Sequence, residues 1–365
     1  MVVRGVSSQA AARTGGRSRP DQVRRRAVAT IVDVAGRARV SPATVSRVLT
    51  GSSHAVHAET RRRVLAATRA LGYLPNMAAR SLLTRQTSAI GILVPDVSNP
   101  YYAVILRGIE DTASRTGHAI ILCNTDRRHD KQQTYLRTLL ERRVDGLIVA
   151  GGTFRREDLA PFSWRLPPIV VIGRHNVPLP SVRVDNVEAA AAATRHLIAL
   201  GHRRIACLAG PRNSLTAADR LRGYRKAIRE AGLAPRADYV AEAEFTLDGG
   251  RVGAGRLFEL DLPPTAVVAS SDQMAIGIIR ALHEMGRAVP QDISIVGFDD
   301  SPLAAHAVPA LTSVAIPMYE MGCRATVLLL CLLRGEPGAG IVLPVELRVR
   351  ETTAPPRNGT RASVS

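Results

Sequence analysis

The chain has 365 residues, of which 46% are hydrophobic, and it carries a formal net charge of +18. A chain of this length is expected to form two or more domains, each with its own core. Its four cysteines are far apart and form no CxxC or Cys/His spacing, which argues against a disulfide framework and a zinc site. No apolar run reaches the roughly 20 residues of a membrane span, and the N-terminus lacks the apolar segment of a signal peptide, so a cytoplasmic protein is expected.

The positive charge is concentrated at one end. The first 85 residues contain 16 arginines and three acidic residues, a net charge of +13 that leaves only +5 for the rest of the chain. A basic terminal module is typical of a polyanion binder, because each phosphate contact releases condensed counterions. A solvated tail from an arginine-rich genome is the alternative, since 47 of the 49 cationic residues are arginine.

Residues 1–28 lack apolar periodicity and are predicted to be a disordered basic tail. From Thr30, which can cap a helix, apolar residues repeat at helical spacing as far as Ala38. Ser41-Pro42 then starts a second helix, with a hydroxyl at the cap and proline at the first helical position. A third helix is predicted over 58–71. The short turn between the first two helices predicts a helix-turn-helix domain over 29–74.

From Ser88 onward, apolar strand-like runs alternate with amphipathic helices. The predicted strands cover 89–95, 119–125, 146–151, 169–173, 204–210, 266–271 and 293–298. This alternation predicts an α/β core of two doubly wound, parallel-sheet lobes with ligands at the carboxyl ends of the strands. The core is assigned to 88–350, with one lobe from about 88–186 plus 318–345 and the other from about 187–317 plus 346–352. Residues 75–87 are assigned to a linker, and 353–365 to a disordered tail.

Residues 30–82, from "TIVDVAGRARVSPATVSRVL" to "LGYLPNMAARSL", resemble the headpiece and hinge of the lactose-repressor (LacI/GalR) family. The resemblance continues through "AIGILVPDVSNPYYAVILRGIE", "LLERRVDGLIV", "RLRGYRKAI", "SSDQMAIG" and "ISIVGFDD". It implies a helix-turn-helix headpiece, a hinge helix and a periplasmic-binding-protein-like core. The expected function is that of a transcription regulator, a repressor in the first instance, with no cofactor. It would bind a near-palindromic DNA operator as a homodimer.

In a helix-turn-helix the second helix enters the major groove, and Arg47 has the geometry for a bidentate bond to guanine. By resemblance, Pro42 and Ala43 also stand at positions that set operator sequence, and Leu82 of the hinge helix would wedge into a base step. Ser41 could instead be only a helix cap, and Leu82 only a buried leucine. The full set of DNA-binding candidates is Thr30, Ser41, Pro42, Ala43, Thr44, Ser46, Arg47, Asn76, Ala79 and Leu82.

Three residues depart from the family pattern in the headpiece. Arg39 occupies the turn, where Gly or Asn is usual, and Gly36 lies inside the first helix. His57 replaces the serine that commonly caps the third helix. Together they predict a marginally stable headpiece.

The predicted effector site lies between the lobes, where a few polar groups and an aromatic wall would hold a small molecule. Its candidates are Asp96, Asn99, Tyr101, Tyr102, Asn124, Asp126, Arg174, Arg220, Phe245, Ser271, Asp272 and Asp299. Asp272 could instead cap a helix, and Asn99 could only form a turn. Gly173 replaces a carboxylate that the family often uses. A sugar or sugar derivative is expected as the effector, although carboxylates, nucleobases and protein co-regulators also occupy this fold.

Three other readings remain. An enzyme is disfavoured because the chain has no P-loop, GxSxG, strand-linked GxGxxG or metal-ligand motif, so no catalytic residue is assigned. A solute-binding protein is disfavoured by the basic headpiece. The core could also serve only for dimerisation or for binding a protein co-regulator. The sequence does not decide whether the effector releases or promotes DNA binding.

Overall fold

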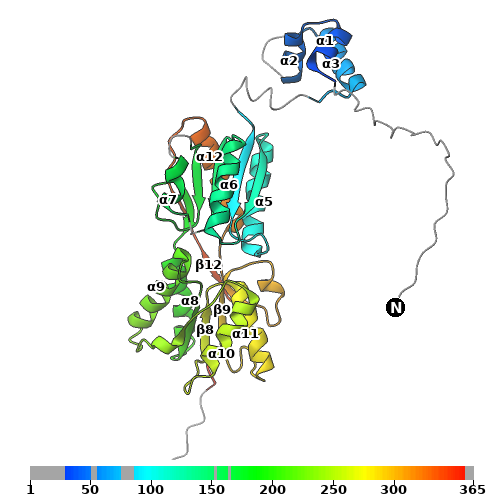
Figure 1. Cartoon of the computed structure of the whole chain (residues 1–365). Coiled ribbons are helices and arrows are strands. Elements are labelled where there is room, and N and C mark those ends of the chain that lie inside the picture. Colours follow the sequence, from blue (N-terminus) through cyan, green and yellow to red (C-terminus); the bar gives the residue numbers. More distant parts are fainter. Residues whose placement is uncertain (1–28, 51–55, 75–85, 152–153, 163–165, 358–365) are drawn as a thin grey trace, which may run out of the picture. The chain divides into compact units, whose positions relative to one another are not determined.

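The computed structural model describes residues 29–50, 56–74, 86–151, 154–162 and 166–357. The predicted hinge residues Asn76, Ala79 and Leu82 lie outside these ranges, as do the predicted tail 1–28 and residues 358–365. The described chain forms two compact units, a small headpiece and a large core (Figure 1).

The headpiece consists of three helices, α1 (Ile31–Ala38), α2 (Pro42–Thr50) and α3 (Ala58–Leu71). Their apolar faces meet in one small core, which the helical spacing of the sequence predicted. The fully buried members of this core are Val34, Ala35, Ala38, Val45, Val48, Val64 and Ala67. Three short helices thus close a core without any covalent link.

The caps of these helices follow the sequence signals closely. Thr30 forms a capping box with Asp33: its hydroxyl accepts from the Asp33 amide, while the Asp33 carboxylate accepts from the Thr30 amide at 2.8 Å. Arg39 ends α1 in the left-handed conformation, with φ 53°. His57 precedes α3 without a side-chain capping bond. The two unfavourable cap positions expected from the sequence, Arg39 and His57, are therefore present in the fold.

The core is built on two six-stranded sheets. The first has the strand order β11-β5-β4-β3-β1-β2, all parallel. The strands are β1 (Ala89–Val94), β2 (Ala119–Asn124), β3 (Gly146–Ala150), β4 (Ile169–Ile172), β5 (Ser181–Val184) and β11 (Ile341–Leu343).

The second sheet has the order β12-β10-β9-β8-β6-β7, and only β12 runs antiparallel to its neighbour. Its strands are β6 (Ile205–Ala209), β7 (Val240–Glu242), β8 (Ala266–Ala269), β9 (Ser294–Asp299), β10 (Thr312–Ala315) and β12 (Glu346–Arg348). Two doubly wound α/β lobes were predicted, and this prediction is confirmed.

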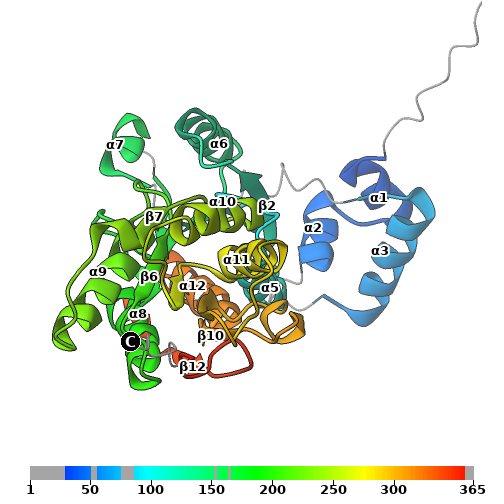
Figure 2. The same ribbon diagram turned by 90° about the horizontal axis from the view of Figure 1, so that it is seen from below.

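Helices cover both faces of each sheet, because alternate residues of every buried strand point to opposite sides. In β6, Ile205 and Cys207 pack with α8 (Asn186–Ala199) and α9 (Leu215–Glu230), whereas Leu208 packs with α10 (Leu247–Phe258) and α11 (Asp272–Glu284). Figure 2 shows α10 beside α11 on one side of the second sheet and α8 on the other.

The first sheet follows the same rule. Its faces are covered by α5 (Pro100–Arg115) with α12 (Met318–Leu333) and by α6 (His129–Glu141). Short helical segments α7 (Arg156–Leu159), η1 (Ala160–Phe162), η2 (Ala237–Tyr239) and η3 (Ala304–His306) complete the described core. No described helix is both long and apolar enough to cross a lipid bilayer.

The expectation of a disordered tail from residue 353 is wrong for its first residues. The Ala354 carbonyl accepts from His202 Nε2 at 2.9 Å, and the Ala354 amide donates to Ser294 Oγ at 3.0 Å. Thr352 is fully buried, and its hydroxyl donates to the Ile295 carbonyl. These hydrogen bonds hold residues 352–354 against β9. Their polar sequence has no periodicity, so it gave no sign of this order.

Candidate functional site

The candidate DNA-reading surface is the start of α2. Ser41 Oγ accepts from the Thr44 amide at 3.2 Å and lies 3.0 Å from Thr44 Oγ1, so its hydroxyl caps the helix. Pro42, Ala43 and Arg47 are exposed on the same helix. The structure therefore presents a helix-turn-helix whose second helix begins with exposed side chains.

The other described DNA-binding candidates of the headpiece differ in exposure and in whether their polar groups already form hydrogen bonds. Thr30 is exposed, but its hydroxyl lies 2.7 Å from the Asp33 carboxylate within the capping box. Ser46 is partly buried. Arg61, Arg63 and Arg69 of α3 are exposed and add positive charge to the unit.

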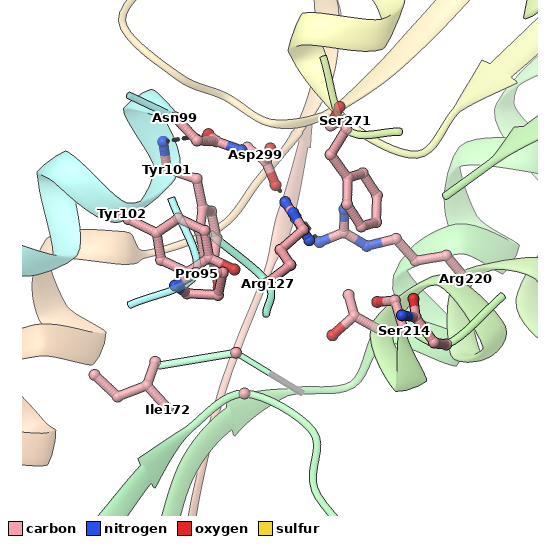
Figure 3. A pocket seen from close by; sticks show the side chains of 15 residues that line it. Pro95, Asn99, Tyr101, Tyr102, Arg127, Ile172, Ser214, Arg220, Ser271 and Asp299 are labelled. Atoms are coloured by element: carbon pink, nitrogen blue, oxygen red, sulfur yellow. Dashed lines mark hydrogen bonds and ion pairs between the residues drawn. The ribbon is translucent and has the colours of Figure 1, made fainter. Parts of the chain in front are cut away.

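The core contains a small cavity of about 70 Å³ that opens to solvent. It is lined from both lobes by Pro95, Asn99, Tyr101, Tyr102, Arg127, Gly151, Ile172, Gly173, Asn213, Ser214, Thr216, Arg220, Phe245, Ser271 and Asp299. In Figure 3, Asn99, Tyr101 and Tyr102 lie on one side, Ser214 and Arg220 on the other, and Arg127 and Asp299 between them.

The position of the cavity follows from the topology. Pro95, Gly151 and Gly173 each follow a strand of the first sheet, at its carboxyl end. Ser271 and Asp299 stand at the carboxyl ends of β8 and β9 in the second sheet. Both sheets reverse their strand order beside the cavity, at β1/β3 and at β6/β8. Doubly wound sheets bind ligands at this kind of crevice.

Arg220 is the most firmly held polar side chain of the cavity. Its Nε donates to Asn186 Oδ1 at 2.9 Å, and its Nη1 donates to the Ser270 carbonyl at 2.5 Å. Its guanidinium also lies over the Phe298 ring, 4.1 Å from the centroid. This arrangement fixes the guanidinium plane before any ligand binds.

Asp299 lies 3.5 Å from Arg220, and both side chains are more than nine-tenths buried. Burial raises the pKa of Asp299, whereas the neighbouring Arg220 charge lowers it and favours the ionised carboxylate. The backbone at Asp299 has a φ of 108°, a region that side chains rarely adopt. The fold therefore holds this carboxyl group under backbone strain at the cavity wall.

The two tyrosines form the other wall. Their rings meet edge to face, with centroids 5.0 Å apart. Burial raises the pKa of Tyr101, and it raises that of Tyr102 to about 12, so both hydroxyls stay protonated and can donate hydrogen bonds. Asn99 caps α5 by accepting from the Tyr101 amide at 2.9 Å.

Seven of the twelve predicted effector-site residues line this cavity, and the structure does not bring the other five to it. Asp96 accepts from Ser98, and Asn124 and Asp126 bond to each other. Arg174 pairs with Asp219 at 3.2 Å.

Asp272 also lies outside the lining, buried beneath it. Its carboxylate accepts from the Ser301 amide at 2.6 Å and from Ser313 Oγ at 2.6 Å. The cap of α11 is Ser271, whose hydroxyl accepts from the Met274 amide, and not Asp272. Asp272 thus ties the start of α11 to β10.

Sequence reasoning missed Arg127, Asn213, Ser214 and Thr216 in the lining. Ser214 carries a local signal, because it caps α9 by accepting from the Ala217 amide at 3.2 Å. Arg127 carries none. It reaches the cavity from the loop after β2, where Asp126 and Arg127 both adopt positive φ, and its guanidinium lies 5.5 Å from the Phe245 ring of the other lobe.

Comparison with known proteins agrees with both units. Residues 30–76 match the family model "Bacterial regulatory proteins, lacI family", and residues 194–353 match "Periplasmic binding protein-like domain". Catabolite control protein A of Priestia megaterium is 37% identical over 89% of this chain and 99% of its own length. The HTH-type transcriptional repressor CytR of Escherichia coli K12 is 36% identical over 89% of this chain and 96% of its own length.

Among solved structures, the lac repressor dimer bound to operator and an anti-inducer aligns with a TM-score of 0.82 and 31% identity. The alignment covers 90% of this chain and 99% of that one. A complex of the transcriptional regulator CelR with cellobiose aligns with a TM-score of 0.67 and 34% identity, over 89% of this chain and 99% of that one. These relatives are regulators and not enzymes. The chain belongs to the lacI family of bacterial regulatory proteins and is a DNA-binding regulator of transcription.

Proposed function

We propose that this regulator is a repressor that binds a near-palindromic operator as a homodimer, and that a small molecule in the cavity between the lobes changes its operator affinity. The observation that carries the proposal is the convergence of polar groups from both lobes on one cavity: Asn99, Tyr101 and Tyr102 from one lobe, and Arg220 and Asp299 from the other. A ligand touching both lobes has a different affinity for different lobe arrangements, which is what coupling to DNA binding requires.

A sugar or sugar derivative is the effector class that we propose. Arg220, Asn99 and the two tyrosine hydroxyls offer donors for hydroxyl oxygens, while Phe245 supplies an apolar wall. Among the relatives are the CelR–cellobiose complex and a LacI family regulator from Enterococcus faecium with bound ribose. The remaining site assignments are part of the proposal: Thr30, Ser41, Pro42, Ala43, Thr44, Ser46 and Arg47 on DNA, and Asn76, Ala79 and Leu82 in a hinge.

Further parts of the proposal concern where the protein acts and what its domains are. We propose that it acts in the cytoplasm, on the nucleoid, since operator DNA is its partner. We also propose that the lobes comprise about 88–186 plus 318–345 and about 187–317 plus 346–352.

The second candidate function is a regulator whose core only dimerises or binds a protein co-regulator. Footprinting of the full chain on its own upstream DNA, with and without a panel of sugars and metabolites, tests both candidates. We expect a protected palindrome whose protection a compound changes. Protection that no compound alters would favour the second candidate, and diffuse, salt-sensitive binding alone would contradict the operator reading.

A further inference from the structure

The cavity has an excess of positive charge. Its lining contains two guanidinium groups, Arg127 and Arg220, and a single carboxyl group, Asp299. Asp299 is already paired with Arg220 at 3.5 Å. The nearby carboxylate of Asp96 is occupied by the amide and hydroxyl of Ser98, at 2.9 and 2.6 Å.

Arg127 accounts for this excess. Its neighbour Asp126 forms an ion pair with Lys131 and a hydrogen bond with Asn124, so that carboxylate is occupied elsewhere. In the described part of the chain, the Arg127 guanidinium forms no ion pair with a carboxylate, and its contact is the face of the Phe245 ring, 5.5 Å away. Arginine is suited to pairing with carboxylates and phosphates, and the half-buried Arg127 guanidinium faces the cavity, where such a group could bind.

The backbone around the cavity adds further positive electrostatic potential. Three helices begin at the lining: α5 after Asn99, α9 after Ser214 and α11 after Ser271. These helices are 16, 16 and 13 residues long. The N-terminus of a helix carries a partial positive charge and attracts anions.

The cavity also has room for a group beside these charges. Gly173 lines it with a φ of 100°, and a Cβ atom placed there would meet no heavy atom within 4 Å. Neither a side chain nor a packed neighbour fills the wall at that point.

We propose that the effector carries an anionic oxygen group, a carboxylate or a phosphate ester, and that Arg127 binds this group and selects such ligands over their neutral counterparts. This inference rests on the proposed function, because it names the chemical class of the effector at the same cavity. A charged group bound by Arg127 would also replace a contact that now joins the two lobes, the Arg127–Phe245 stack.

Calorimetric titration of the full chain with matched probes tests the inference. The pairs are glucose with glucose 6-phosphate, ribose with ribose 5-phosphate, and glucose with glucuronate, and inorganic phosphate is titrated alone. We expect an anionic member to bind about tenfold or more tightly than its neutral partner, because a charge-assisted bond is stronger than a neutral one. The phosphate and carboxylate arms separate the two possible sources of charge.

Three variants test whether Arg127 is the source of the preference for anionic over neutral probes. Arg127→Gln should abolish it, and Arg127→Lys should retain a measurable part because the charge remains. Arg128→Gln is the matched control, since Arg128 is the next residue, is exposed and pairs with Asp130 at 2.5 Å. It removes one positive charge from the same loop and should leave the preference unchanged. Anion binding by the basic headpiece would persist in all three variants, so loss of the preference in Arg127→Gln alone would exclude the headpiece as its source.

Equal binding of neutral and charged partners, a preference that survives in Arg127→Gln, or no binding by any anionic probe would each overturn the inference. A neutral sugar that binds and alters operator protection would overturn the charge selection while supporting the proposed function. If no probe binds and none changes the footprint, the small-molecule part of the proposed function fails as well.

Discussion

Arg220 and Asp299 lie 3.5 Å apart at the cavity wall, with side chains only 6% and 9% exposed. The two residues come from α9 and from the end of β9, so their pairing ties a helix to a strand beside the cavity. Separating two buried charges leaves the remaining one without compensation, and this costs far more than breaking a surface pair.

Arg220→Met is therefore expected to lower the free energy of unfolding by about 3–5 kcal/mol. The variant leaves Asp299 buried alone and removes the donors to Asn186 Oδ1 and the Ser270 carbonyl. Urea unfolding of the full chain, followed by the signal of the core, measures the loss. The double variant Arg220→Met/Asp299→Asn should recover part of it, because no buried charge remains. A loss below about 1 kcal/mol, as for a surface pair, would contradict a firmly buried pair.

The fold was largely predictable where local chemistry and tertiary packing agree. Thr30 and Ser41-Pro42 mark helix starts that the structure contains, and the predicted apolar strands β3, β4, β6, β8 and β9 are fully buried. The sequence prediction missed β10, Thr312–Ala315, because Thr312 and Ser313 are polar yet completely buried. Their hydroxyls bond to Thr353 and Asp272, partners about 40 residues away along the chain.

The cavity was predictable only in part for a similar reason. Residues that follow a buried strand, such as Ser271 and Asp299, can be placed at a sheet edge from the sequence. The position of Arg127 depends on two successive residues with positive φ and on an aromatic ring in the other lobe. Neither feature leaves a periodic pattern in the chain.

Arg39→Gly is expected to stabilise the headpiece by about 1 kcal/mol, because glycine adopts a φ of 53° without the Cβ clash of arginine. Hydrogen exchange of the α1–α3 amides in the full chain measures the change. Arg37→Gly is the matched control: it removes the same charge, but Arg37 lies inside α1, where glycine should destabilise by about 0.5–1 kcal/mol. Equal effects of both variants would show that charge, and not backbone conformation, determines the change.

Arg47→Ala is expected to weaken binding to the protected palindrome by about 1–3 kcal/mol, while binding to random DNA changes much less. The reason is that Arg47 is exposed on α2, the helix that enters the major groove in this motif. Fluorescence anisotropy at a fixed salt concentration measures both affinities. Arg61→Ala removes an exposed charge from α3 and should weaken both complexes to a similar extent. The same uniform loss in Arg47→Ala would contradict a base-reading role.

His202 should make the stability of the core depend on pH. Its ring is buried, with Nδ1 3.0 Å from Thr265 Oγ1 and Nε2 3.1 Å from Ser294 Oγ, and burial lowers its pKa. The folded state thus binds a proton on this ring less readily than the unfolded chain does. The stability that neutral His202 contributes is present above its ordinary pKa of 6.5 and is lost as the pH falls through the lowered value.

His202→Gln, which cannot take up this proton, is expected to be less stable than the wild type by about 1–3 kcal/mol near neutral pH. The difference should shrink as the pH falls below about 6.5. In the wild type the unfolded chain then gains a proton on His202 more readily than the folded state, and the glutamine variant has no such group. Urea unfolding of both proteins at each pH measures it, and their difference cancels the opposite slope from Asp299, whose pKa is raised. His283→Gln changes an exposed histidine and should give no such trend. A difference that stays constant from about pH 8 to about pH 5 would show that the fold accommodates a charged His202.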